Sequence, residues 1–247
     1  MRGHIFTTSI VLSVFLISCG SSSTHLPGGL ALEEHILSQA PSSDPYSFQP
    51  VEGTQKEILA KHADERGKVM PIEYTFVDDN PALSEPWGGD ELVAVLLTDA
   101  DSYEQTIQLI DHDDVIFSTS AGMPSPVMPL QGLWTYGRHW ALEILYATPE
   151  VWTGQIFIDG DMVNQDKNYE EAFGFQMLSS RPFFFYQHNG QIGISYDGQE
   201  ADLGYTSIPH YLCCAESVLN PIPAENMVAF FAQRQGKWYY VEIGIFE

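Results

Sequence analysis

Short runs of apolar and β-branched residues recur along the chain after about residue 70. Four of these runs end in glycine, at Gly122, Gly160, Gly198 and Gly244, so the glycines are 38, 38 and 46 residues apart. Each run follows a second β-rich run, at residues 91–98, 139–146, 181–187 and 226–233. A period near 40 residues with three or four strands in each unit predicts an all-β array of about four repeats.

The dipeptides between the runs are typical of tight β-hairpins. Asp159-Gly160, Asn189-Gly190 and Asp197-Gly198 are residue pairs that adopt positive φ at low cost. A third strand is expected within each of the first three units, at residues 127–134, 169–178 and 203–211, whereas the last unit has two strands. The unit is therefore strand, turn, strand ending in glycine, turn, strand.

Residues 70 to 247 resemble the repeats of TolB-like β-propellers, in which a strand ending in Asp-Gly precedes a strand that contains tyrosine. In the first and last units Ala121-Gly122 and Ile243-Gly244 replace Asp-Gly. The resemblance implies a small propeller-like array, although an open meander or a β-sandwich fits the same strands. Residues 71–77 form a strand without a unit of their own, and we expect them to close the array by pairing with the last unit.

Composition narrows the class of protein. The chain has 247 residues, 44% of them hydrophobic, with 10 basic and 33 acidic residues and a net charge of −23. The apolar content allows one sizeable domain or two small ones and excludes a disordered chain. Binding a phosphate backbone requires clustered Lys and Arg, so nucleic acid is excluded as a partner.

The N-terminus has the form of a secretory signal. A short positive segment, residues 1–4, precedes an apolar stretch, residues 5–17, that is too short to span a membrane. Leu16-Ile17-Ser18-Cys19-Gly20 resembles the lipobox of bacterial lipoproteins. The resemblance implies that residues 1–18 are removed and that acyl chains such as palmitate on Cys19 hold the protein, outside the cytoplasm, to the cell membrane or the outer membrane. An ordinary cleaved signal is the alternative.

Two segments precede the repeats. Residues 19–54 are rich in Gly, Ser and Pro and predict a flexible tether, interrupted by a short helix over residues 31–39. Residues 55–68 predict a second short helix and contain four of the chain's ten basic residues. The β-repeat domain is expected over residues 69–247.

Cys213 and Cys214 are the other two cysteines of the chain. In an oxidising compartment this adjacent pair could form a vicinal disulfide, or the two side chains could be buried thiols. His210 precedes them by three residues, so a zinc site is a third alternative. It is disfavoured because adjacent cysteines do not easily serve one tetrahedral centre.

Acidic turns are candidate calcium sites. Asp111 and Asp113 lie in one turn, Asp159 and Asp161 lie in another, and His210 is an additional potential ligand. Neither turn has the order of an EF-hand loop, so solvated acidic turns are the alternative. We therefore expect no cofactor, with calcium as the exception to test.

Aromatic residues offer one further candidate site. Trp134 and Trp140 could stack against a sugar ring at a binding face, or they could belong to the core.

The chain contains no nucleophile, metalloprotease or nucleotide-binding motif. These observations favour a lipid-anchored binding or scaffold module over an enzyme, with an envelope protein or a glycan as its partner. The alternative is a protein that acts on, or binds, cell-envelope polysaccharide through acidic and aromatic side chains.

Overall fold

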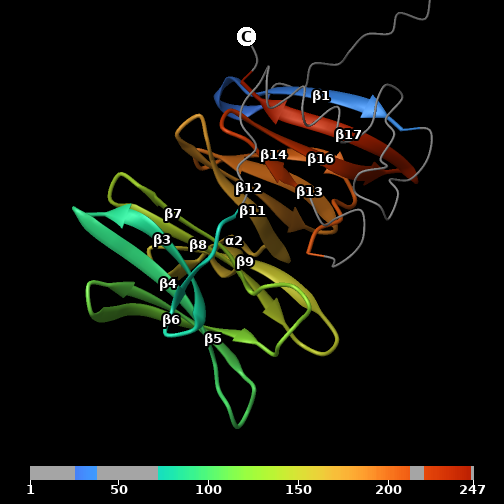
Figure 1. The fold of residues 1–247 in the computed structure, drawn as a ribbon. Helices are drawn as coiled ribbons and strands as arrows, with labels where there is room; N and C mark the ends of the chain where they lie inside the picture. The colour runs from blue at the N-terminus through green and yellow to red at the C-terminus, as the bar shows by residue number, and fades with distance from the viewer. Residues whose placement is uncertain (1–25, 38–71, 212–219, 246–247) are drawn as a thin grey trace, which may run out of the picture.

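The computed structural model describes residues 26–37, 72–211 and 220–245, and these residues are almost entirely β (Figure 1). One 3-10 turn, η1 (Pro27–Gly29), and one short helix, α2 (Val163–Lys167), accompany the strands. The strands are β1 (Ala31–Ile36), β2 (Thr75–Val77), β3 (Asn80–Trp87), β4 (Asp90–Thr98), β5 (Gln105–Asp111), β6 (Asp114–Gly122), β7 (Leu130–Tyr136), β8 (His139–Ala147), β9 (Trp152–Ile158), β10 (Asp161–Met162), β11 (Glu171–Leu178), β12 (Arg181–His188), β13 (Gln191–Tyr196), β14 (Gln199–Tyr205), β15 (Ile222–Pro223), β16 (Met227–Arg234) and β17 (Lys237–Gly244).

The strands form four consecutive antiparallel meanders. Strands β2 to β6 make the first and β7 to β10 the second, and these two are joined into one nine-stranded sheet by a single parallel bridge, Gly122 to Ala147. Strands β11 to β14 make the third, and β15 to β17 with β1 make the fourth. The expected all-β fold of repeated antiparallel units is thus confirmed.

Apolar side chains hold successive meanders together. The first and second share a core that includes Leu92, Ile107 and Leu142, whereas the third and fourth share one that includes Phe185 and Phe230. A third cluster, of β8 and β9 with β11 and β12, joins the second meander to the third. The first and fourth meanders lie at opposite ends of the molecule, so the described strands form no closed ring of blades (Figure 1).

The segment expected as a tether with a helix over residues 31–39 is different in the structure. Residues 31–36 form strand β1, which pairs antiparallel with β17 from Ala31 opposite Gly244 to Ile36 opposite Tyr239. An extended segment can satisfy the backbone groups along that edge of β17, which an isolated short helix cannot do. Glu34 secures the strand by accepting hydrogen bonds from the Tyr205 hydroxyl at 2.6 Å and from Arg234 at 2.7 Å.

The expected closure by residues 71–77 is wrong. Strand β2 pairs with β3 through a two-residue turn at Asp78 and Asp79, both at positive φ (48° and 64°), and belongs to the first meander. The place beside β17 is taken by β1 instead. The first unit also differs, because β5 lies between the two runs that were expected to form its hairpin.

The predicted hairpin turns are confirmed. Asp159, Asn189 and Asp197 have φ values of 53°, 51° and 51°, and the glycine after each has φ between 68° and 94°. These values are those of type I′ turns, which fix the register of the flanking strands.

Several predictions concern residues outside the described ranges. They are the signal peptide, the lipidated Cys19, the helix over residues 55–68 and the cysteine pair Cys213 and Cys214. Within the described ranges, no helix is long and apolar enough to cross a membrane.

Candidate functional site

A shallow pocket of about 310 Å³ lies on the third meander, beside α2. Its volume is at the lower end of the range for small-molecule sites, about 300–1,000 Å³. The residues that line it are Lys167, Tyr169, Tyr186, His188, Glu200, Ala201 and Asp202.

The register of the sheet places the floor of this pocket. Tyr186 of β12 is directly opposite Gly193 of β13, which is directly opposite Asp202 of β14. Residues opposite each other share one face of a sheet, and so do residues two apart along a strand. His188 and Glu200 therefore lie on the same face as Tyr186 and Asp202.

Gly193 makes room for the ring of Tyr186. A Cβ atom at this position would lie 2.2 Å from Cζ of Tyr186 and 2.4 Å from its hydroxyl oxygen. The ring therefore lies across the backbone of β13, and its hydroxyl donates to Oδ1 of Asp202 at 3.4 Å. Tyr169 stacks on Tyr186, with ring centroids 4.3 Å apart and planes 6° apart. Tyr186 is thus held between a glycine and a second aromatic ring.

Helix α2 positions the wall of the pocket. Asn164, buried within the helix, accepts a hydrogen bond from Ile156 N–H at 3.1 Å and donates to the Gly154 carbonyl at 2.9 Å. These two bonds fasten α2 to β9. The helix ends at Asn168, which has left-handed φ and ψ, so the chain reverses and brings Lys167 and Tyr169 to the pocket.

Charges in the pocket are largely paired with one another. Lys167 Nζ lies 2.9 Å from Oε1 of Glu200, and this bond holds the pKa of Glu200 below its usual value. Burial and the nearby Asp202 raise the pKa of Tyr186 to about 12. His188 donates from Nδ1 to the Asn168 carbonyl at 3.0 Å.

The pocket therefore offers both donors and acceptors on a rigid aromatic support. The raised pKa of Tyr186 keeps its hydroxyl protonated at neutral pH, and the lowered pKa of Glu200 keeps its carboxylate an ionised acceptor. Such a mixture suits a small ligand with several hydroxyl or amine groups.

A second polar cluster is buried where β8 meets β11. Glu143, 3% exposed, accepts hydrogen bonds from Gly174 N–H at 2.8 Å and Phe175 N–H at 2.6 Å, and also from the Tyr211 hydroxyl. Gly174 lies in a β-bulge of β11 at φ 66°. Burial raises the pKa of Glu143, although the hydrogen bonds oppose the shift. The cluster joins the second and third meanders.

His210 lies at the edge of this cluster. Its ring stacks on Phe173 with centroids 3.7 Å apart, and Nδ1 donates to the Ile208 carbonyl at 2.6 Å. Nε2 lies 3.2 Å from Oε1 of Glu171, which also accepts a hydrogen bond from Gly154 N–H. This histidine therefore has structural partners at both ring nitrogens.

The acidic residues predicted as calcium ligands do not come together. Asp111 interacts with His112 at 2.8 Å, whereas Asp159 contacts His139 Nδ1 at 2.5 Å and accepts from Trp140 N–H at 3.0 Å. Asp113 is exposed in its turn, and Asp161 is exposed in strand β10. Within the described ranges, no three His, Cys, Asp or Glu side chains are arranged to hold a metal ion.

Trp134 and Trp140, the two residues predicted to stack against a sugar, pack against other aromatic side chains of the protein. Trp140 is 7% exposed and contacts Phe117, with ring centroids 5.3 Å apart. Trp134 packs on Phe175 at 4.8 Å, and its ring lies over the backbone of Gly132. Both rings therefore have packing partners within the protein, and a sugar-stacking role for them stays a prediction.

None of the pocket residues was singled out from the sequence. The turns Asn189-Gly190 and Asp197-Gly198 could have identified part of the pocket. They fix the register of β12, β13 and β14, and this register places Tyr186, Gly193 and Asp202 opposite one another. In comparisons with known proteins, no family model, no curated protein and no solved structure matches this chain.

Proposed function

We propose that this protein is a lipid-anchored, extracytoplasmic binding module with an open, propeller-like array of four blades. In this proposal each meander is one blade, and β1 completes the last blade. The array presents the pocket of the third meander to a small polar ligand, for which the first class to test is a sugar residue of a cell-envelope glycan.

The observation that supports a binding role is the construction of the pocket floor. Tyr186 is fixed between Gly193 and Tyr169, and its hydroxyl is directed to Asp202. A site whose side chains are already ordered loses little conformational entropy when a ligand binds. A mixture of donors and acceptors on an aromatic support is what a polyhydroxylated ligand requires.

The binding experiment uses the full-length protein in a non-ionic detergent and a panel of soluble oligosaccharides and peptidoglycan fragments. Isothermal titration calorimetry should detect saturable binding of at least one member. Asp202→Asn should weaken that binding about tenfold, since it removes a charged acceptor. Asp161→Asn, an exposed carboxylate outside the pocket, is the matched control and should leave the affinity unchanged. Equal affinities for both variants would reject the pocket.

The anchor is tested separately. Cys19→Ala should move the protein from the membrane fraction to the soluble fraction after cell lysis, because two or more acyl chains are needed for stable attachment. A variant that stays in the membrane fraction would contradict the lipid anchor but would leave the pocket proposal intact.

Glu200 and Asp202 also favour one alternative, an enzyme that acts on envelope polysaccharide, because both carboxylates line the same pocket. The same oligosaccharide panel distinguishes the enzyme from the binding module. Release of shorter products that is abolished by Glu200→Gln or Asp202→Asn would indicate hydrolysis, whereas binding without turnover supports the binding module.

A further inference from the structure

Strand β6 has one open edge. Its inner edge pairs with β5, whereas among the described residues the outer edge makes a single bridge, from Gly122 at its end to Ala147 of β8. Within the described part of the chain, the strand from Asp114 to Ala121 therefore has a hydrogen-bonded neighbour on one side only. An edge of this kind presents backbone N–H and C=O groups that another strand can pair with.

Most other sheet edges in the described part of the chain are short or contain charges. Strand β7 is uncharged, but the first meander contacts it, since Tyr74 donates to the Leu130 carbonyl at 2.7 Å and Thr135 donates to the Pro86 carbonyl at 2.9 Å. Strands β2, β10 and β15 have two or three residues each. Strand β1 contains Glu33 and Glu34, and β14 contains Glu200 and Asp202. Charged side chains and short strands are the usual protection against pairing with a foreign strand. Strand β6 has nine residues, and residues 115–122 include no charged residue.

The open edge of β6 has exposed apolar side chains at one end, and packing of Phe117 against the core fixes the position of the strand. Val115 and Ile116 are 51% and 47% exposed, although both are large hydrophobic residues. A β-bulge at Ile116 precedes a regular stretch from Phe117 to Ser120. The ring of Phe117 packs against Phe157 with centroids 5.1 Å apart, so the strand is ordered before any partner arrives.

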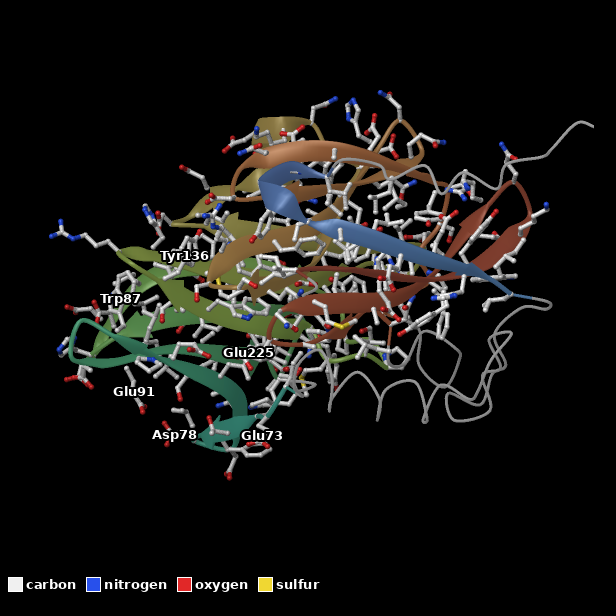
Figure 2. All side chains as sticks on the ribbon, turned by 90° about the horizontal axis from the view of Figure 1, so that it is seen from above. Glu73, Asp78, Trp87, Glu91, Tyr136 and Glu225 are labelled. Atoms are coloured by element: carbon white, nitrogen blue, oxygen red, sulfur yellow. The ribbon has the colours of Figure 1, made fainter. Side chains whose placement is uncertain are left out.

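The surroundings of this edge are negatively charged. Between Lys68 and Arg138 the chain has twelve acidic residues and no Lys or Arg. Three of them lie at the start of β6, where Asp111 is opposite Asp114 and Asp113 is exposed in the turn between β5 and β6. Others lie across the first meander, where Figure 2 labels Glu73, Asp78 and Glu91. A partner that approaches β6 therefore meets a field that favours positive charge.

We propose that the outer edge of β6, from Val115 to Ser120, binds an extended, Lys- or Arg-rich segment of a partner polypeptide by strand addition. Main-chain hydrogen bonds to the edge supply affinity, Val115 and Ile116 give an apolar contact, and the acidic meander selects a basic partner. A second copy of this chain is disfavoured as the occupant, because pairing β6 with itself would bring two acidic meanders together.

The test uses the full-length protein in a non-ionic detergent and fluorescently labelled octapeptides of alternating Lys and Val. Fluorescence polarisation should show saturable binding of this peptide. N-methylation of alternate peptide amides keeps the charge and the side chains but removes main-chain donors, and it should weaken binding about tenfold or more. The corresponding Glu and Val peptide should not bind.

Two protein variants locate the site. Ile116→Lys places a repelling charge on the edge and should weaken binding of the Lys and Val peptide about tenfold, the effect of placing like charges side by side. Ile36→Lys is the matched control, since Ile36 is 48% exposed and lies on β1 at the other end of the molecule. It should leave the affinity unchanged. The N-methylated peptide needs no variant and keeps the test valid if Ile116→Lys does not fold.

Three results would overturn the proposal. Equal binding of the N-methylated peptide would indicate charge attraction without strand addition. Undiminished binding by Ile116→Lys would place the peptide elsewhere. A dimer that Ile116→Lys dissociates, with no peptide binding by the wild-type protein, would assign the edge to a second copy of the chain.

Discussion

Replacing Glu143 by alanine should destabilise the protein at the junction of its second and third meanders. The carboxylate of Glu143 is the acceptor for the N–H groups of Gly174 and Phe175 and for the hydroxyl of Tyr211. Alanine would leave these three donors without that acceptor. Each buried donor left unpaired costs about 1–3 kcal/mol, and removal of the buried carboxylate itself offsets part of this sum.

We therefore expect Glu143→Ala to lower the free energy of unfolding by about 3–5 kcal/mol at pH 7. For a domain of this size that corresponds to a fall in Tm of about 6–20 °C. Urea denaturation followed by circular dichroism measures the free energy, and Glu150→Ala is the matched control. Glu150 is exposed in a turn, so its loss should change stability by less than about 0.5 kcal/mol.

The effect should also depend on pH with a definite sign. Burial raises the pKa of Glu143, so the folded protein binds a proton at a pH where the unfolded chain does not. Linkage then makes the contribution of this group to stability rise as the pH falls from neutral toward the ordinary carboxyl value of 4.5. The stability deficit of Glu143→Ala should therefore be larger at pH 5 than at pH 8. A deficit below about 1 kcal/mol at pH 7, or one that shrinks on acidification, would show that Glu143 is not the buried acceptor on which this junction depends.

Three further substitutions test other contacts. Gly193→Ala should lower the free energy of unfolding by about 1–3 kcal/mol in urea denaturation, because the Cβ of the alanine would lie 2.2 Å from the Tyr186 ring. An unchanged denaturation midpoint would contradict the close approach of the Tyr186 ring to the backbone of Gly193. Asn164→Ala should cost about 2–4 kcal/mol and lower Tm, since the Ile156 N–H and the Gly154 carbonyl lose their partner; a loss under about 1 kcal/mol would show that α2 is held by other contacts. Lys167→Gln should cost less than about 1 kcal/mol, because its ion pair with Glu200 is 52% and 39% exposed; a larger loss would assign the pair a structural role.

Much of the sheet architecture could be predicted because strand period and turn type are local properties. The runs at residues 139–146 and 181–187 are strands β8 and β12 within a residue or two. The Asn-Gly and Asp-Gly pairs form the tight turns that their chemistry favours. The same turns would have placed Tyr186 opposite Gly193, so this part of the pocket was within reach of the sequence.

Other features depend on contacts between distant segments. Strand β1 exists because the edge of β17, some 200 residues later, pairs with it, and nothing in the local sequence of residues 31–36 specifies that partner. Tyr169 reaches the pocket only because Asn164 fastens α2 to β9. Glu143, by contrast, is an acidic residue within an apolar strand, and this pattern already indicates a buried polar contact.

The most direct test of the proposed binding function is a chemical-shift titration of the isotopically labelled full-length protein with the oligosaccharide that binds most tightly in calorimetry. We predict saturable shifts of the amides of Tyr186, His188, Ala201 and Asp202. The fitted dissociation constant should rise about tenfold in Asp202→Asn and stay unchanged in Asp161→Asn. Saturable shifts that map to another meander, or dissociation constants that are identical in the two variants, would contradict binding at this pocket.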